Sequence, residues 1–152
     1  MNHPLLAEEG KAIRDPVWGY IHVPVPVLAL IDTEDFQRLR NITQLGYVHL
    51  VYPGARHSRF EHSLGVYHLA KQFLARLLDS QPPLVLSDED VRVFIAATLL
   101  HDIGHYPFSH TLEELMPFFV LHEERARQII EDQNGAIYQV LDRIFQVDPV
   151  RV

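Results

Sequence analysis

The stretch VRVFIAATLLHDIGH, residues 91–105, decides the fold of this chain. Its first ten residues are almost all apolar, and Ser87 with the acidic residues 88–90 predicts the start of a buried helix that ends at His101. His101 and Asp102 close this helix beside the core, where ionisable side chains need strong partners. Neutral imidazole and carboxylate are good ligands for a divalent cation. The stretch therefore predicts half of a metal site at the end of a buried helix.

A second helix, predicted over residues 58–78, supplies a candidate third ligand. His62 lies in its first turns, beside an apolar stripe that must pack against another element. Adjacent residues of a helix point about 100° apart, so His101 and Asp102 converge on one ion only at the helix end, where Gly104 leaves room. Alone, His62 would be interpreted as an ordinary core or surface histidine. Beside the other two residues, we predict that it is a ligand.

Two further histidines follow the ligand pair. Metal ligation is open to His105 and His110, but we favour roles as donors to phosphate oxygens and as a general acid. His110 and Glu113 are three residues apart on a short helix predicted over 110–115, so the carboxylate can orient the imidazole. An N-terminal cap with a surface pair is the alternative. His122, followed by a glutamate, repeats the pattern at the start of a helix predicted over 122–132, where a simple helix start is the alternative.

Composition restricts the class of protein. The 152 residues carry a formal net charge of −7, which argues against strong nucleic-acid binding and would repel an anionic substrate at long range. A bound cation with local Arg and His side chains would have to reverse that field inside a site. There is no cysteine, so disulfides and thiolate metal sites are excluded. With no membrane-spanning run and no signal-peptide pattern, we expect a cytoplasmic protein without a membrane partner.

The rest of the chain predicts a mainly α-helical single domain over residues 1–152. Residues 1–12 are expected to be a loose lead-in. The remaining elements are a strand or hairpin over 15–23, a helical turn over 27–31, a helix over 34–44 capped by Thr33, a strand over 47–52, a loop over 80–86 and a helix over 135–146.

Three motif blocks resemble the HD-domain phosphohydrolases. They are RFEHSLG (59–65), HDIGH (101–105) and PFSH (107–110), and the nearest branch is the deoxynucleoside triphosphate triphosphohydrolases with SAM and HD domains. RDPVWGYI (14–21), IDTEDFQRLR (31–40) and QLG (44–46) extend the resemblance, which covers about residues 13–124 in order. The resemblance implies an HD-type helical bundle with a short N-terminal β-hairpin. It also implies hydrolysis of a deoxynucleoside triphosphate to nucleoside and triphosphate.

The resemblance assigns roles to the histidines. One divalent ion would be bound by His62, His101 and Asp102; the sequence does not choose among Mn, Fe, Co, Ni, Zn and Mg. His105 would contact the α-phosphate. His110, with Glu113 behind it, would donate a proton or organise attack at the α-phosphorus.

It also assigns substrate and regulatory residues. Arg59 would bind phosphate, His122 would lie along the phosphate chain, and Gln44 would hydrogen-bond the sugar. A nucleotide-binding regulatory site would include Lys11, Asp32, Gln37 and Arg40. A solvated helix face is the alternative for the last two.

Two departures from the family pattern qualify these assignments. Trp18 stands where the family usually has His, and we expect it to pack without a chemical role. The family completes its metal site with an Asp roughly seventy or more residues after the HD pair, beyond residue 152. We therefore expect these residues to be the N-terminal part of a longer phosphohydrolase, with weak activity alone and a tendency to associate with other copies. The alternatives are an inactive metal- or nucleotide-binding module and an HD phosphohydrolase that acts on another phosphoester.

Overall fold

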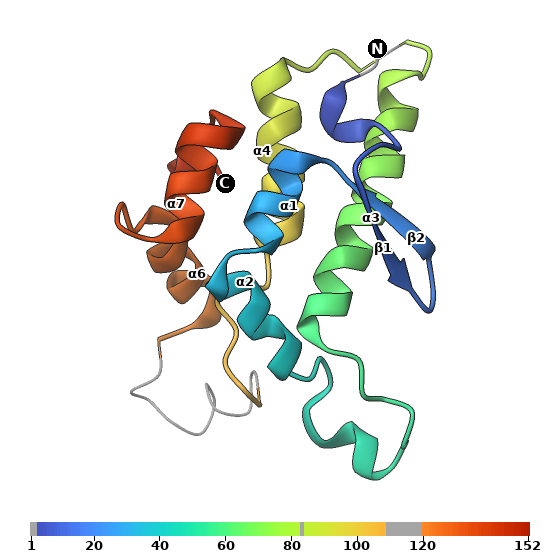
Figure 1. Ribbon diagram of the computed structural model, residues 1–152, viewed down its shortest axis with the longest axis vertical. Coiled ribbons are helices and arrows are strands. Elements are labelled where there is room, and N and C mark those ends of the chain that lie inside the picture. Colours follow the sequence, from blue (N-terminus) through green and yellow to red (C-terminus); the bar gives the residue numbers. More distant parts are fainter. Residues whose placement is uncertain (1–2, 83, 109–119) are drawn as a thin grey trace.

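A computed structural model of the chain describes residues 3–82, 84–108 and 120–152. It is mainly helical, with one two-stranded antiparallel sheet near the N-terminus, as predicted (Figure 1). The strands and α-helices are β1 (Lys11–Asp15), β2 (Gly19–Val23), α1 (Val25–Ile31), α2 (Glu34–Arg38), α3 (Arg59–Leu78), α4 (Asp88–Leu100), α6 (His122–Glu131) and α7 (Ala136–Val140). No helix in the described part of the chain has the length and hydropathy that a membrane crossing requires.

Helices α3 and α4 form the antiparallel pair on which the molecule is built (Figure 1). Each begins with a capping box, because Ser58 and Glu61 cap α3 and Ser87 and Asp90 cap α4. The predicted helix over 58–78 and the Ser87 cap are thus confirmed. Since the two helices run in opposite directions, the start of α3 lies beside the end of α4, where the candidate ligands are.

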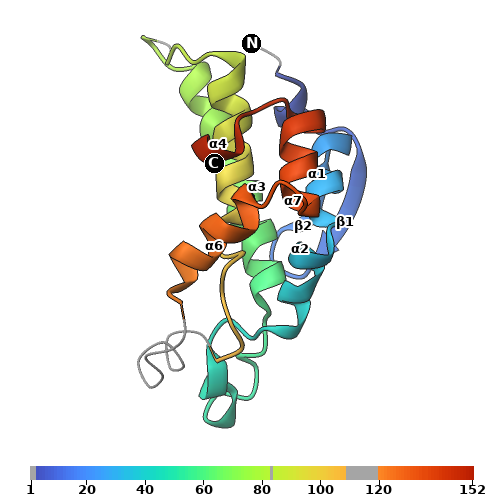
Figure 2. The ribbon, with the colours of Figure 1, turned by 90° about the vertical axis from the view of Figure 1, so that its left-hand side faces the viewer.

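The core lies between this pair and the shorter helices. Its fully buried side chains include Phe36 of α2, Tyr67 of α3, Leu99 of α4 and Ile137 of α7. Figure 1 shows α6 and α7 on the side of α4 away from the hairpin, and Figure 2 shows α6 crossing in front of α4, so that α4 lies between these helices and α3. This position explains why residues 91–100 are mostly apolar rather than apolar on one face alone.

The hairpin begins earlier than predicted. Its register pairs Lys11 with Val23 and Asp15 with Gly19, so the strand starts inside the segment expected to be a loose lead-in. The same segment contains a 3-10 helix, Pro4–Leu6, whose Leu5 side chain is buried in the core. The lead-in prediction was wrong because one apolar side chain and a strand pairing are enough to fix a segment that shows no periodicity.

Three other boundaries differ from the predictions. Residues Gly46–Leu50 form a 3-10 helix rather than part of a strand, and no partner strand lies beside them in the described residues. Helix α2 ends at Arg38 and continues as a 3-10 turn, Leu39–Asn41. The last predicted helix is divided into α7 and a π-helical turn, Leu141–Phe145. The helix predicted over 110–115 lies outside the described residues.

Candidate metal centre

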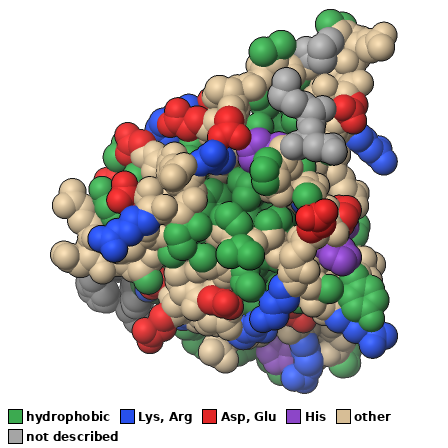
Figure 3. Space-filling model, turned by 45° about the horizontal axis from the view of Figure 1, so that its top comes forward, with side chains coloured by type: hydrophobic (Ala, Val, Ile, Leu, Met, Phe, Trp, Pro, Cys, Tyr) green, Lys and Arg blue, Asp and Glu red, His purple; other side chains and the backbone are tan. Residues whose placement is uncertain are grey.

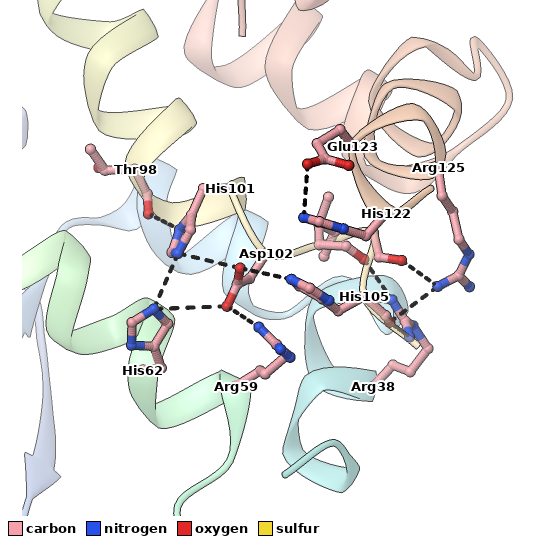
Figure 4. Close-up of polar contacts among 12 residues, drawn as sticks. Arg38, Arg59, His62, Thr98, His101, Asp102, His105, His122, Glu123 and Arg125 are labelled. Carbon is pink, nitrogen blue, oxygen red and sulfur yellow. Dashed lines mark hydrogen bonds and ion pairs between the residues drawn. The ribbon is translucent and has the colours of Figure 1, made fainter. Parts of the chain in front are cut away.

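Two histidines and one aspartate converge where the start of α3 meets the end of α4. His62 lies in the first turns of α3, and His101 and Asp102 directly follow α4. Donor atoms of the three side chains all lie within 4.8 Å of one another. Figure 4 shows the three side chains pointing toward one another. The structure therefore brings together the residues that the sequence singled out as ligands.

The orientation of His101 is set by its own helix. Its Nδ1 atom lies 2.9 Å from the carbonyl oxygen of Thr98, which can only accept a hydrogen bond. Nδ1 must therefore carry the proton, and in the neutral ring Nε2 carries the lone pair. Nε2 faces His62 and Asp102, so the end of α4 holds His101 in the tautomer that a metal ligand needs.

The spacing of the donor atoms fits a single divalent ion. The Nε2 atoms of His62 and His101 are 3.3 Å apart. Two imidazole nitrogens at about 2.0–2.1 Å from one ion would be about 2.9–3.4 Å apart in octahedral or tetrahedral geometry. Asp102 Oδ1 lies 3.5 Å from the Nε2 atom of His101, and Oδ2 lies 3.8 Å from that of His62. Small movements would place a carboxylate oxygen in the same coordination sphere.

Asp102 is buried in the middle of the group. Arg59 Nη1 donates to its Oδ2 at 2.6 Å, and His105 Nε2 lies 3.3 Å from its Oδ1. Burial by itself would raise the pKa of the Asp102 carboxyl, but the hydrogen bond from His105 and the charges of His101 and Arg59 outweigh burial and hold the pKa well below its usual range. Asp102 is therefore an anion, as a carboxylate ligand must be.

The two histidines on either side of Asp102 are held in the neutral form. Burial lowers the pKa of His62, with the charge of His101 acting in the same direction and Asp102 opposing it. Burial also lowers the pKa of His105, against the hydrogen bond to Asp102. A neutral ring has a free lone pair, so the electrostatics of the site favour metal binding by His62.

A second pair of rings extends the site beyond Asp102. The rings of His105 and His122 stack with centroids 4.0 Å apart and planes inclined by 14°. His122 Nε2 lies 3.3 Å from Glu123 Oε1 at the start of α6. Figure 4 shows His62 and His122 at opposite ends of this group, with Asp102 between them. Imidazole groups thus continue from the candidate ligands to α6.

A match to a known protein family identifies the domain that contains this cluster of histidines and Asp102. Residues 59–146, which include the candidate ligands and the stacked pair, match the family model of the HD domain. The chain belongs to the HD domain family. The resemblance inferred from the motif blocks is thereby confirmed.

Relatives of this HD domain include several named enzymes. The chain is 44% identical over 106 residues to a deoxynucleoside triphosphate triphosphohydrolase SAMHD1 homolog of Dictyostelium discoideum, covering 70% of this chain and 21% of the relative. It is 48% identical over 103 residues to deoxynucleoside triphosphate triphosphohydrolase SAMHD1 of Bos taurus, covering 68% and 18%. A phosphohydrolase crystal structure from Bacteroides thetaiotaomicron matches with a TM-score of 0.71 and 38% identity, covering 87% of this chain and 34% of that one. The chain thus spans about a fifth of the length of these two curated relatives.

Two arginines that sequence reasoning missed fix the loop of the HD motif. Arg38 of α2 donates from Nη1 to the carbonyl of His105 at 2.7 Å and from Nη2 to that of Ile103 at 2.6 Å. Arg125 of α6 donates to the carbonyls of Gly104 and His105 at 2.9 and 3.2 Å. We call Arg38 and Arg125 the arginine clamp. It ties the backbone after Asp102 to α2 and α6, and so fixes where His105 meets the carboxylate.

Gly104 of the HD motif has a packing role in addition to leaving room at the end of α4, the role predicted for it. A Cβ atom at this position would lie 1.9 Å from the carbonyl oxygen of His122 and 2.6 Å from the backbone nitrogen of Ala126. Only a residue without a side chain lets α6 approach this closely. Gly104 therefore brings the His122 ring next to His105.

The remaining catalytic and substrate residues are placed unevenly. Arg59 is almost fully buried with Asp102 as its partner, so any phosphate contact must be made alongside this ion pair. Gln44 Oε1 is buried and has no hydrogen-bond partner among the described residues. His110 and Glu113 lie outside the described residues.

The predicted regulatory residues are only partly brought together. Gln37 and Arg40 are joined by a 2.7 Å hydrogen bond, and the Arg40 guanidinium lies 3.5 Å from the centroid of the Phe60 ring. Asp32 is the exposed C-cap of α1, and Lys11 is the exposed first residue of β1. Arg40 is exposed, as the alternative of a solvated face predicts, and it lines a pocket of about 360 Å³ together with two other arginines, Arg14 and Arg56.

Proposed function

We propose that this HD domain carries the metal site of a phosphohydrolase that cleaves deoxynucleoside triphosphates to nucleoside and triphosphate. The observation that carries the proposal is the convergence of His62, His101 and the ionised Asp102 at a spacing that suits one divalent ion. Similarity to relatives named deoxynucleoside triphosphate triphosphohydrolases supports the substrate class. We also propose that residues 1–152 form one domain of HD type.

Each residue of the group has a proposed task. His62, His101 and Asp102 would hold the ion, which when bound would polarise a phosphate oxygen or activate a water molecule. Because His105 is buried against Asp102, we assign it first to orienting the carboxylate and only second to the α-phosphate. Arg59 neutralises part of the charge on Asp102 and keeps an anionic substrate from meeting an unshielded carboxylate.

Neighbouring residues extend these assignments. His122 would lie along the phosphate chain, and the buried Gln44 Oε1 would accept a hydrogen bond from the sugar. His110 with Glu113 would supply the proton for the leaving group. Arg40 and the arginines of its pocket would bind an anionic regulatory ligand such as a nucleotide.

Metal binding is tested first. Purified protein should contain or take up about one divalent ion per chain, and His101→Ala should lose it because it removes one of three ligands and the hydrogen bond that orients it. His49→Ala, a histidine outside the cluster, is the matched control and should bind the ion normally. Elemental analysis of the three proteins is the measurement. Equal metal in the wild type and His101→Ala would overturn the ligand assignment.

The reaction is tested with the same metal-loaded protein. Deoxynucleoside triphosphates are supplied with Mn or Mg, and the products are separated by anion exchange. Triphosphate with deoxynucleoside is the expected pair. Release of phosphate or pyrophosphate would instead identify a hydrolase of another phosphoester bond. Because the sequence predicts weak activity for these residues alone, even slow release of triphosphate supports the enzyme, whereas binding of metal and nucleotide without any product favours a binding module, the second function that the site supports.

A further inference from the structure

The arginine clamp brings two cations to one acceptor. Arg38 and Arg125 both donate from Nη1 to the carbonyl oxygen of His105, at 2.7 and 3.2 Å, and Figure 4 shows the two side chains converging there. Burial lowers the pKa of the Arg38 guanidinium, and the charge of Arg125 lowers it further, whereas Asp35 opposes both effects. Both guanidiniums stay charged at neutral pH. The two cations therefore repel each other, and the clamp needs other contacts that hold Arg125 in place.

The Tyr106 ring makes such a contact. Tyr106 follows His105 directly, and its ring centroid lies 4.4 Å from the guanidinium carbon of Arg125. A guanidinium within about 6 Å of a ring centroid is attracted by the negative face of the ring. Both side chains are half-buried, and the attraction is stronger where water is partly excluded. The Tyr106 ring therefore stabilises Arg125 in a position that repulsion from Arg38 disfavours.

Arg125 links this ring to the loop that precedes it. Its Nη1 atom donates to the carbonyls of Gly104 and His105, the two residues directly before Tyr106. The side chain of His105 continues the connection, because its Nε2 atom lies 3.3 Å from Asp102 Oδ1. Without the ring, the long side chain of Arg125 would be free to turn toward solvent. The two carbonyls would then lose a donor, and His105 would be held less firmly against Asp102.

We propose that Tyr106 is a positioning residue of the metal centre, whose ring holds Arg125 on the backbone of residues 103–105 and so fixes His105 against Asp102. Tyr106 lies between the HDIGH and PFSH motif blocks and belongs to neither. It acts through Arg125 and is not among the candidate ligands. The inference rests on the proposed function where its effect is measured as metal affinity, but the order of the loop can also be measured without a metal.

Two substitutions of Tyr106 separate its ring from its hydroxyl group. Tyr106→Phe keeps the aromatic face, and its affinity for a divalent ion should stay close to the wild-type value. Tyr106→Leu keeps an apolar side chain without that face, and metal affinity should fall about tenfold, the lower end of the usual loss when a group that supports the ligands is removed. Tyr52→Leu, which replaces an exposed tyrosine outside the site, is the matched control and should bind the ion normally. Calorimetric titration measures the affinity, and thermal unfolding checks that each protein is folded.

A double-mutant cycle tests whether Tyr106 acts through Arg125. Arg125→Met removes the guanidinium and should lower metal affinity at least as much as Tyr106→Leu does. Adding Tyr106→Leu to Arg125→Met should cause no further loss, because the ring then has no cation to hold. A purely structural role of the ring would instead give two independent losses that add. Arg125→Gln, which also removes the cation, provides the same cycle if the Met variants do not fold.

Amide hydrogen exchange measures the order of the loop directly in the metal-free protein. The backbone nitrogen of Ile103 donates to the Leu100 carbonyl at 2.9 Å, and that of His105 donates to the Asp102 carbonyl at 3.2 Å. Exchange at these two amides should be faster in Tyr106→Leu than in the wild type and unchanged in Tyr106→Phe.

The outcomes separate this inference from the proposed function. Equal metal affinity of wild type and Tyr106→Leu, equal losses in Tyr106→Phe and Tyr106→Leu, or additive losses in the cycle would each overturn the role of the ring. If the wild type binds no metal, the proposed function fails. Faster exchange in Tyr106→Leu alone would then still support the inference, whereas unchanged exchange would overturn it.

Discussion

At the scale of single residues, His110 and Glu113 carry the prediction that concerns catalysis. If they transfer a proton, His110→Ala in the longer phosphohydrolase that the sequence predicts should lower turnover by about 10²–10⁴, the usual contribution of a positioned acid or base. Metal content should stay the same, because the proposed ligands are His62, His101 and Asp102. Turnover and bound metal are measured on the same preparations. A loss of metal equal to the loss of turnover would make His110 a ligand.

Single residues were predicted best where a local motif specifies their chemistry. His62, His101 and Asp102 were chosen from short sequence patterns, and the structure brings them together. The ion pair of Arg59 with Asp102 joins residues 43 positions apart, and nothing in the sequence near Arg59 indicates it. Such pairs depend on the packing of α3 against α4, so they could not be predicted from the local sequence.

At the scale of elements, the arginine clamp predicts a loss of metal affinity from a change outside the ligands. Arg38→Lys keeps the charge, but a single ammonium group cannot reproduce the fork that binds the carbonyls of Ile103 and His105. The loop after Asp102 should loosen, and metal affinity should fall about 10–100-fold, as is typical when groups that orient ligands are lost. Calorimetric titration with the divalent ion measures this change.

The control for the clamp is another arginine that binds a backbone carbonyl. Arg92 of α4 donates to the carbonyl of Phe145 at 2.9 Å, away from the HD loop. Arg92→Lys should lower the temperature of unfolding while metal affinity stays at the wild-type value. If Arg38→Lys and Arg92→Lys bind metal equally well, the clamp serves stability alone.

The long helices were predicted well because each has a clear N-terminal capping signal followed by a long run of helical spacing. Ser58 with Glu61 and Ser87 with Asp90 are local signals, and both long helices begin at them. Residues 47–52 were predicted as a strand from their β-branched and aromatic side chains, yet no strand pairs with them in the described structure, and a 3-10 helix covers Gly46–Leu50 instead. Because strand formation depends on a partner, composition alone could not decide that segment.

At the scale of the whole molecule, His68 predicts how stability depends on pH. Burial, followed by the charge of Lys71, lowers the pKa of His68, and the Gln72 amide nitrogen lies 2.9 Å from its Nε2 atom. The unfolded chain therefore binds a proton at this histidine more readily than the folded chain does. The contribution of neutral His68 to the free energy of unfolding is fully present above about pH 6.5 and should be lost as the pH falls below that value.

Thermal unfolding between about pH 8 and pH 5.5, with a chelator present, checks this prediction. The decline toward low pH should be smaller in His68→Gln, although His62 and His105, whose pKa values are also lowered, will still contribute. His49→Gln controls for the loss of a histidine outside the core. An unchanged decline in His68→Gln would contradict the assignment.

The tertiary arrangement was the least predictable part of the molecule. Lys71 is fully buried, with Nζ close to Glu8 and to the carbonyls of Ala7 and His22, so that a lysine of α3 fixes the N-terminal segment. A lysine in a helix normally predicts a solvated face. Figure 3 likewise shows hydrophobic side chains gathered at the centre of one face, with charged side chains around them. Where such groups lie depends on how elements far apart in sequence meet.

The hydrogen bond from His101 to the Thr98 carbonyl restricts how this centre can be changed. That carbonyl belongs to the last turn of α4, where backbone oxygens lack partners within the helix. A cysteine or carboxylate at position 101 could still coordinate an ion, but neither ionised side chain can donate to the carbonyl. Redesign toward a metal that prefers thiolate ligands would therefore leave this carbonyl without its donor and weaken the end of α4 unless a new donor were introduced. A substitution at position 101 therefore changes both the metal preference of the site and the stability of the end of α4.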